Sequence, residues 1–254
     1  LDRLDRILNH PTRPVHIIFA GKAHPNDEMG KGIIKRVIDV CRDERFRGKI
    51  FFIEDYNIDI ARRLVQGVDV WLNTPRRPYE ASGTSGEKVV ANGVLNVSIS
   101  DGWWAEGFDG TNGWTIGPVV KGYFPERMNV DEEDGQSLYT VLENSVIPTF
   151  YNREISGLPE KWINMMRRSI QTLMPKFNTE RMLLEYYRTM YLPTAEREHE
   201  LYTSSHKLAR ELADWKRKIP MRFSSLRLMD VSIEGIHGDT VFVDQPLTVN
   251  ARID

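Results

Sequence analysis

Four short apolar runs, separated by helical patterns and polar loops, restrict the fold of this chain most strongly. The runs cover residues 15–20, 49–56, 68–73 and 94–100. Helical periodicity fills 27–42 and 58–67, and a shorter helical stretch begins at Glu87. Because the runs lack polar alternation, they predict parallel strands in a sheet that helices cover on both faces. We therefore expect an α/β fold, whose ligands bind outside the carboxyl ends of the strands.

The pattern changes in the second half of the chain. Residues 131–135, DEEDG, predict a charged, turn-like break, and helical periodicity dominates from Gln136 onward. Within this region we expect Pro193 to end one helix. After Pro220 the pattern becomes β, with a hairpin turn expected at 237–239. The chain thus divides into an expected α/β domain over 1–133, a helical region over 134–218 and the start of a small β segment over 219–254.

Both ends of the sequence fall inside a regular pattern. Apolar residues recur at helical spacing from Leu1 to Leu8, and they alternate as in a half-buried strand from Leu247 to Ile253. We therefore expect the chain to be a segment of a longer polypeptide.

Composition narrows the classes of function. The chain has 34 basic and 36 acidic residues and a net charge of −2, so its charge gives no reason to expect binding to nucleic acid or to a membrane surface. No stretch approaches the roughly 20 apolar residues of a membrane-spanning helix. Cys41 is the only cysteine, which excludes an intrachain disulfide and makes a cytoplasmic location the simplest expectation.

The segment EASGTSGEK, residues 80–88, has the pattern of an anion-binding loop. Small residues and hydroxyls lead into a helix, and Lys88 lies in what we expect to be its first turn. Backbone N–H groups at such a helix start bind phosphate. A lysine there can pair with phosphate or form a Schiff base with an aldehyde cofactor that carries a phosphate. A surface turn with a solvated lysine is the alternative that the pattern alone leaves open.

Other candidate residues have simpler interpretations. His24 follows the first strand without a visible partner, so we interpret it as structural rather than as an acid–base group. The adjacent Asp27 and Glu28 lack further ligands at suitable spacing, so we expect no metal site. The pair Trp103–Trp104 is compatible with stacking on a sugar and with a place in the core.

The motifs taken together resemble those of a known enzyme family. EASGTSGEKVVANGVLN, following EDYNIDIARRLVQGVDVWLN, closely resembles the α-glucan phosphorylases, which include glycogen, starch and maltodextrin phosphorylases. The segments 21–35, 101–107 and 158–187 resemble further blocks of that family, the last in its shorter bacterial and archaeal branch. The resemblance implies that 1–133 is the Rossmann-like C-terminal domain of the two-domain GT-B glycosyltransferase fold.

The resemblance also implies roles for residues of the loop. Lys88 would be the lysine that forms the Schiff base with pyridoxal phosphate. Thr84 and Ser85 would hold the cofactor's phosphate, and Tyr56 would lie near the cofactor.

The substrate side of the loop follows from the same likeness. Glu80 and the backbone of Ser82 and Gly83 would bind hydroxyls of the transferred glucose. The implied reaction is phosphorolysis of the terminal glucose of an α-1,4-glucan to α-glucose 1-phosphate, with inorganic phosphate as co-substrate. The family's other phosphate-binding cations lie upstream of the first residue here, so we expect the isolated chain to be inactive.

Two alternatives stay open at this point. One is a nucleotide-sugar glycosyltransferase of the same fold, and the other is a non-catalytic fragment that binds sugar or phosphate. Glucan length preference, control by effectors and assembly into a homo-oligomer do not follow from the sequence.

Overall fold

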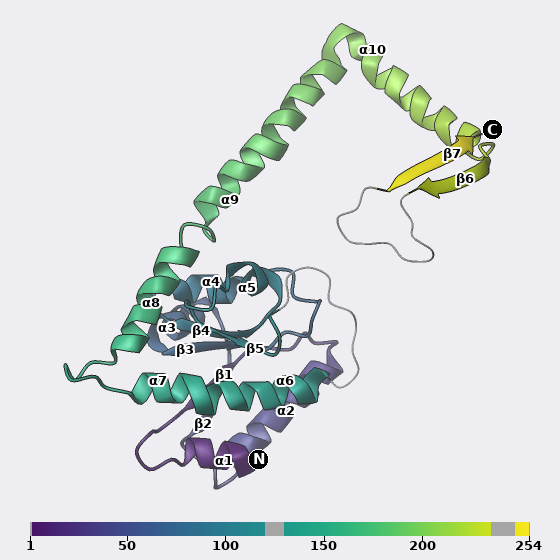
Figure 1. The fold of residues 1–254 in the computed structure, drawn as a ribbon. Helices are drawn as coiled ribbons and strands as arrows, with labels where there is room; N and C mark the ends of the chain where they lie inside the picture. The colour runs from purple at the N-terminus through teal and green to yellow at the C-terminus, as the bar shows by residue number, and fades with distance from the viewer. Residues whose placement is uncertain (1, 120–129, 235–246, 254) are drawn as a thin grey trace. The chain divides into compact units, whose positions relative to one another are not determined.

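The computed structural model of the chain describes residues 2–119, 130–234 and 247–253 (Figure 1). The chain forms two compact units, Leu1–Met182 and Leu183–Asp254. The expected domain boundaries at residues 133 and 218 stay predictions.

Through residue 100 the first unit alternates strands and helices in the order that the sequence predicted, and β5 follows as a strand that was not predicted. Its strands are β1 (Ile17–Ala20), β2 (Ile50–Ile53), β3 (Val70–Asn73), β4 (Leu95–Ile99) and β5 (Trp114–Ile116). Its helices are α1 (Asp2–Leu8), α2 (Glu28–Arg42), α3 (Ile58–Gly67), α4 (Thr84–Val90), α5 (Gly102–Gly107), α6 (Val130–Val141), the π-helical η1 (Leu142–Val146), α7 (Ile147–Tyr151), α8 (Glu160–Leu173) and α9 (Thr179–Tyr186), the last of which runs into the second unit.

The strands pair in parallel, as expected, but they form two small sheets instead of the single sheet that the sequence predicted. β1 pairs with β2, and β4 lies between β3 and β5. Every residue of β4 is buried, which confirms cover on both faces for that strand. The first sheet differs, because Ile18 of β1 and Phe51 of β2 are 44% and 43% exposed.

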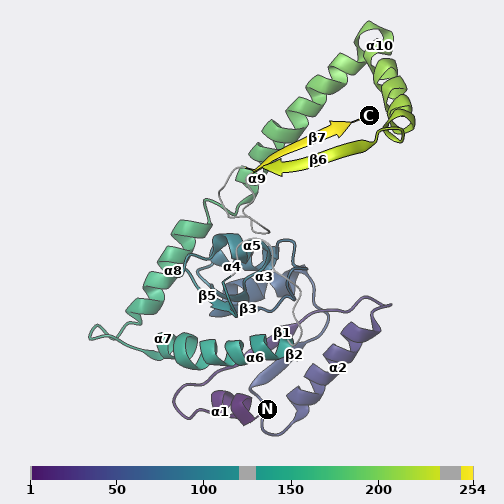
Figure 2. The ribbon, with the colours of Figure 1, turned by 45° about the vertical axis from the view of Figure 1, so that its right-hand side comes forward.

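The core around β4 fixes the position of its carboxyl end. Leu95, Val97 and Ile99 pack against residues from α6, η1, α7 and α8, and Figure 2 shows α6 and α7 as one continuous rod. A separate cluster joins α4 and α5 to α8 and consists of Val90, Trp103, Trp104 and Leu173. The loops after β3 and β4 therefore lead into two helices, α4 and α5, that pack in the core.

The expected break at DEEDG is wrong, because these residues form the first turns of α6. Asp131 pairs with Arg76, and Asp134 accepts two hydrogen bonds from Arg77 Nη2 at 2.8 and 3.0 Å. Acidic side chains also interact favourably with the N-terminal end of a helix. Both effects favour helix where the local composition suggested a turn.

Two π-helical segments stand directly before prolines. The N–H of Ile147 bonds to the carbonyl of Leu142 just before Pro148, and the N–H of Leu192 bonds to that of Tyr187 just before Pro193. In a regular α-helix a proline ring clashes with the carbonyl four residues earlier, and a wider turn relieves that clash. The prediction that Pro193 ends a helix is therefore wrong.

The second unit contains η2 (Tyr187–Tyr191), α10 (Leu192–Phe223), β6 (Leu228–Glu234) and β7 (Thr248–Ile253). β6 and β7 are antiparallel, as the β pattern near the end of the sequence predicted. α10 continues through Pro220 to Phe223, whereas the helical region was expected to end at residue 218. The hairpin turn expected at 237–239 lies outside the described residues.

Candidate functional site

The loop that leads into α4 meets the start of α5 beside the second sheet. The loop follows β3, and α5 follows β4. Because β3 and β4 are parallel neighbours, both segments leave the sheet at the same edge. The N–H of Trp103 donates to the carbonyl of Ser82 at 3.0 Å, so the predicted sugar-binding segment is fastened to α5.

Glu80 and Gly83 lie against each other in this loop. Gly83 has φ 85°, and a Cβ on it would lie 2.7 Å from Glu80 Oε1 and 3.6 Å from Asn73 Nδ2. Glycine is therefore required here both for its left-handed backbone and for the space that the carboxylate occupies. Glu80 is half-buried, and its carboxylate lies directly above the backbone at residue 83.

Lys88 and Thr84 share one face of α4. Lys88 Nζ donates to Thr84 Oγ1 at 3.3 Å, as residues four apart on a helix can. Both side chains and that of Ser85 are exposed. α4 begins at Thr84, three residues earlier than expected, so Lys88 lies in its second turn and not in its first. The site therefore presents an amine and two hydroxyls to solvent.

Gly86 holds α4 against β4 and α5. Asn96 Nδ2 donates to the carbonyl of Gly86 at 3.0 Å. A Cβ on Gly86 would lie 2.7 Å from Asn96 Oδ1 and 2.9 Å from Trp103 Cζ2. The helix that carries Lys88 thus packs through its bare backbone on the strand and helix behind it.

Comparisons with known proteins show which family this chain resembles. A family profile described as carbohydrate phosphorylase matches residues 1–107. A maltodextrin phosphorylase of Thermococcus litoralis is 49% identical over 219 residues, which cover 86% of this chain and 26% of that protein. A glycogen phosphorylase of Mycobacterium bovis is 41% identical over 251 residues, which cover 99% of this chain and 29% of that protein. A glycogen phosphorylase of Aquifex aeolicus is 48% identical over 192 residues, which cover 75% of this chain and 27% of that protein.

The chain belongs to the α-glucan phosphorylase family. It spans between a quarter and a third of the length of these relatives. The match includes the loop at 80–88 and ends at Gly107 of α5 in the family profile.

Tyr56 comes from a different connecting segment than the other predicted cofactor residues of this phosphorylase-family chain. It lies between β2 and α3, next to Asn57, whose side chain caps α3. Within the described ranges, neither Tyr56 nor Ser85 forms a hydrogen bond with Lys88. The structure therefore brings Lys88 close to Thr84 and Glu80 close to Gly83, while the binding roles of all the predicted site residues stay predictions.

A buried ion pair that sequence reasoning missed holds the first part of the loop. The side chains of Arg77 and Asp134 are 3% and 11% exposed. A Cβ on Gly117 would lie 2.6 Å from Asp134 Oδ1, so the chain passes closely over the pair. The sequence signal for this ion pair was the presence of two arginines just before EASGT and of the acidic run 131–134, in which Asp134 lies 57 positions after Arg77.

The remaining candidate residues from the sequence have structural roles. Trp103 and Trp104 are 4% and 0% exposed, which settles the earlier alternative in favour of the core. His24 Nδ1 accepts the N–H of Asn26 at 3.1 Å, and Asp27 caps α2 through the N–H of Gly30 at 2.8 Å. No group of three potential metal ligands occurs among the residues with assigned structure. None of the helices in those residues combines the length and apolarity needed to cross a membrane.

Proposed function

We propose that the natural protein that carries this chain is an α-1,4-glucan phosphorylase. In this proposal it transfers the terminal glucose of a glucan to inorganic phosphate and yields α-glucose 1-phosphate. The observation that carries the proposal is the loop at 80–88, which presents a fixed carboxylate at one end and an amine with two hydroxyls at the other. The relatives named maltodextrin and glycogen phosphorylase support it.

We place this site in the Rossmann-like half of a GT-B fold. Parallel strands and a site at their carboxyl ends support this assignment.

The residues around Lys88 fit pyridoxal phosphate. Its ε-amine is exposed and lies 3.3 Å from the Thr84 hydroxyl, and Ser85 adds a second exposed hydroxyl. Gly83 provides no side-chain cap to α4. Lys88 would hold the aldehyde carbon of the cofactor, and the two hydroxyls would donate to its phosphate. When bound, the cofactor supplies a phosphate group that exchanges a proton with the substrate phosphate.

The other end of the loop fits a sugar. The Glu80 carboxylate would accept hydrogen bonds from glucose hydroxyls, and the N–H groups of Ser82 and Gly83 would donate to them. Hydrogen bonds to a charged group are worth about 1.5–3 kcal/mol each. Since Glu80 is already held above Gly83, it loses little freedom on binding.

Substitution of Lys88 tests the proposal. Lys88→Ala in the natural protein should abolish both attachment of pyridoxal phosphate and release of glucose 1-phosphate from maltodextrin and phosphate. The matched control is Lys35→Ala, which removes an exposed lysine from α2 and should leave both unchanged. Pyridoxal absorbance that survives dialysis in Lys88→Ala would refute the role of Lys88.

Activity of the wild-type protein tests the function itself. Glucosyl transfer from a nucleotide sugar without phosphorolysis would show the glycosyltransferase alternative to be right. Binding of glucan or phosphate with no turnover of either kind would show a binding protein.

A further inference from the structure

Asp101 holds the proposed sugar-binding segment from behind. Its Oδ2 accepts the backbone N–H of Glu80 at 3.0 Å, and its Oδ1 accepts the N–H of Gly102 at 2.9 Å. The N–H of Trp103 donates to the carbonyl of Ser82 at 3.0 Å. Hydrogen bonds therefore attach the backbone of Glu80 to the side chain of Asp101, and the backbone of Ser82 to that of Trp103, at the start of α5.

The loop at 80–88 packs so closely against the start of α5 that there is no room for a side chain at residue 102. Gly102 has φ 52°, and a Cβ on it would lie 2.5 Å from the carbonyl oxygen of Ser82. The same Cβ would lie 3.0 Å from both the carbonyl oxygen and Cγ of Glu80. A shift of α5 would therefore move Glu80 as well.

The first turn of α5 is anchored in the core. Trp103 and Trp104 pack with Leu173 of α8, and the ring of Trp103 meets that of Phe177 edge to face with centroids 5.1 Å apart. Edge-to-face aromatic pairs stabilise their packing by more than the burial of their surface alone. The pair therefore opposes a displacement of α5.

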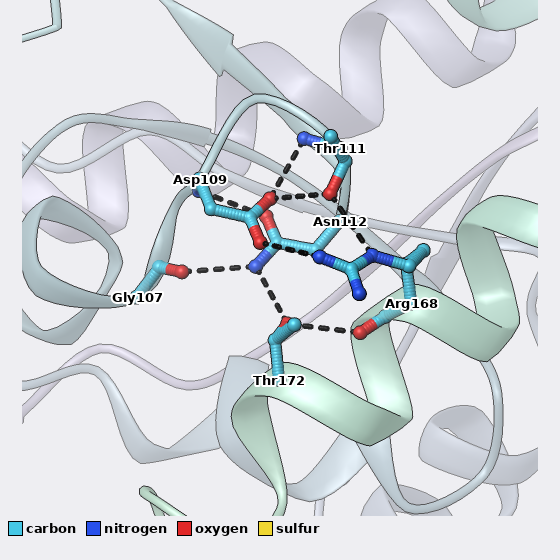
Figure 3. A network of polar contacts seen from close by, with 6 residues as sticks. All are labelled: Gly107, Asp109, Thr111, Asn112, Arg168 and Thr172. Carbon is cyan, nitrogen blue, oxygen red and sulfur yellow. Dashed lines mark hydrogen bonds and ion pairs between the residues drawn. The ribbon is translucent and has the colours of Figure 1, made fainter.

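A polar network anchors the other end of α5 (Figure 3). The buried Asn112 donates from Nδ2 to the carbonyl of Gly107 at 2.9 Å and to Thr172 Oγ1 at 3.0 Å. Arg168 of α8 lies 3.6 Å from Asp109 and donates to Thr111. α5 is thus fixed to α8 at both ends and forms a rigid support for Asp101.

We propose that Asp101 is a positioning residue for the sugar subsite, which it orders through the backbone of Glu80 without contacting the substrate. The proposal rests on the proposed function of Glu80 as a ligand of glucose. Both carboxylate oxygens of Asp101 accept backbone N–H groups, so an amide at this position would turn an NH₂ group toward one of them. That exchange loosens Glu80 but leaves the core and the cofactor site in place.

The test is Asp101→Asn in the natural protein, assayed with glucose 1-phosphate and maltodextrin. We expect kcat/KM to fall about tenfold or more, the typical effect of losing a hydrogen bond to a charged group. Pyridoxal phosphate content should not change. The diagnostic measurement uses mono-deoxy analogues of glucose 1-phosphate. The hydroxyl whose removal costs most in the wild type should cost several-fold less in the variant, because Glu80 no longer lies in place to bind it.

The control is Asp43→Asn, which alters a carboxylate that also accepts a backbone N–H, that of Arg45. It should leave all analogue penalties unchanged. A loss in Asp101→Asn that is equal for every analogue, a loss of cofactor, or no loss at all would overturn the proposal.

Failure of the proposed function gives a different result. If the wild-type protein shows no phosphorolysis, the same variants are compared by equilibrium binding of glucose and its deoxy analogues. Equal analogue penalties there would overturn the role of Asp101, and a reduced penalty in Asp101→Asn would support it.

Discussion

Gly86→Ala should destabilise the protein, although alanine is normally the better helix residue. Gly86 lies inside α4 and is buried. The new methyl would lie 2.7 Å from Asn96 Oδ1 and 2.9 Å from Trp103 Cζ2. Since real Cβ contacts do not come this close, either Asn96 or Trp103 has to move.

The expected magnitude follows from three opposing terms. Alanine gains about 1 kcal/mol of helix propensity over glycine. Overpacking a well-filled site costs about 1–3 kcal/mol, and displacing Asn96 from the carbonyl of Gly86 costs about 0.5–1.5 kcal/mol. The free energy of unfolding should therefore fall by about 1–3 kcal/mol.

Urea unfolding followed by tryptophan fluorescence measures this change, because Trp103 and Trp104 are buried beside α4. The matched control is Gly135→Ala in α6, where a Cβ meets nothing within 4 Å. That variant should gain up to about 1 kcal/mol. If Gly86→Ala proved as stable as Gly135→Ala, the packing argument would be wrong.

Two further predictions concern charged side chains. Glu80→Gln should weaken the use of glucose 1-phosphate roughly ten- to hundredfold while the cofactor stays bound, and unchanged kinetics would make Glu80 only a structural residue of the loop. Hydrogen bonding to Arg3 lowers the pKa of Glu143 from its usual 4.5. The pair therefore stabilises the fold fully above that pH and loses its effect as the pH falls through the lowered pKa. Glu143→Gln should cost at most about 1 kcal/mol near neutral pH and nothing below the folded pKa. Unfolding midpoints of the wild type and Glu143→Gln, measured near neutral pH and below the folded pKa of Glu143, check this prediction. An equal loss of stability at both pH values would contradict it.

Local patterns predicted the elements of the fold better than their pairing. The apolar runs at 68–73 and 94–100 gave β3 and β4, because a buried parallel strand is apolar on both faces. β5 was not expected, since it has only three residues between Gly113 and Gly117. The division into two sheets depends on contacts between distant strands, which periodicity does not encode.

The same distinction holds for the site. Lys88 and Thr84 are four residues apart on one helix, so their meeting follows from helix geometry. The partner of Glu80 is Asp101, 21 positions later, and the partner of Arg77 is Asp134, 57 positions later. These contacts exist only because parallel strands and packed helices bring distant segments together.

The two π-helical segments have a consequence for how these helices can change in evolution. A π turn is equivalent to an α-helix with one inserted residue, and here each insertion is matched by a proline, at Pro148 and at Pro193. Deleting the extra residue alone would press the proline ring against the carbonyl of the preceding turn. Replacing the proline alone would remove the steric clash that favours the π turn over a regular α-helical turn. Insertion and proline are therefore expected to be gained and lost together, so sequence alignments of this region should show a one-residue gap wherever the proline is missing.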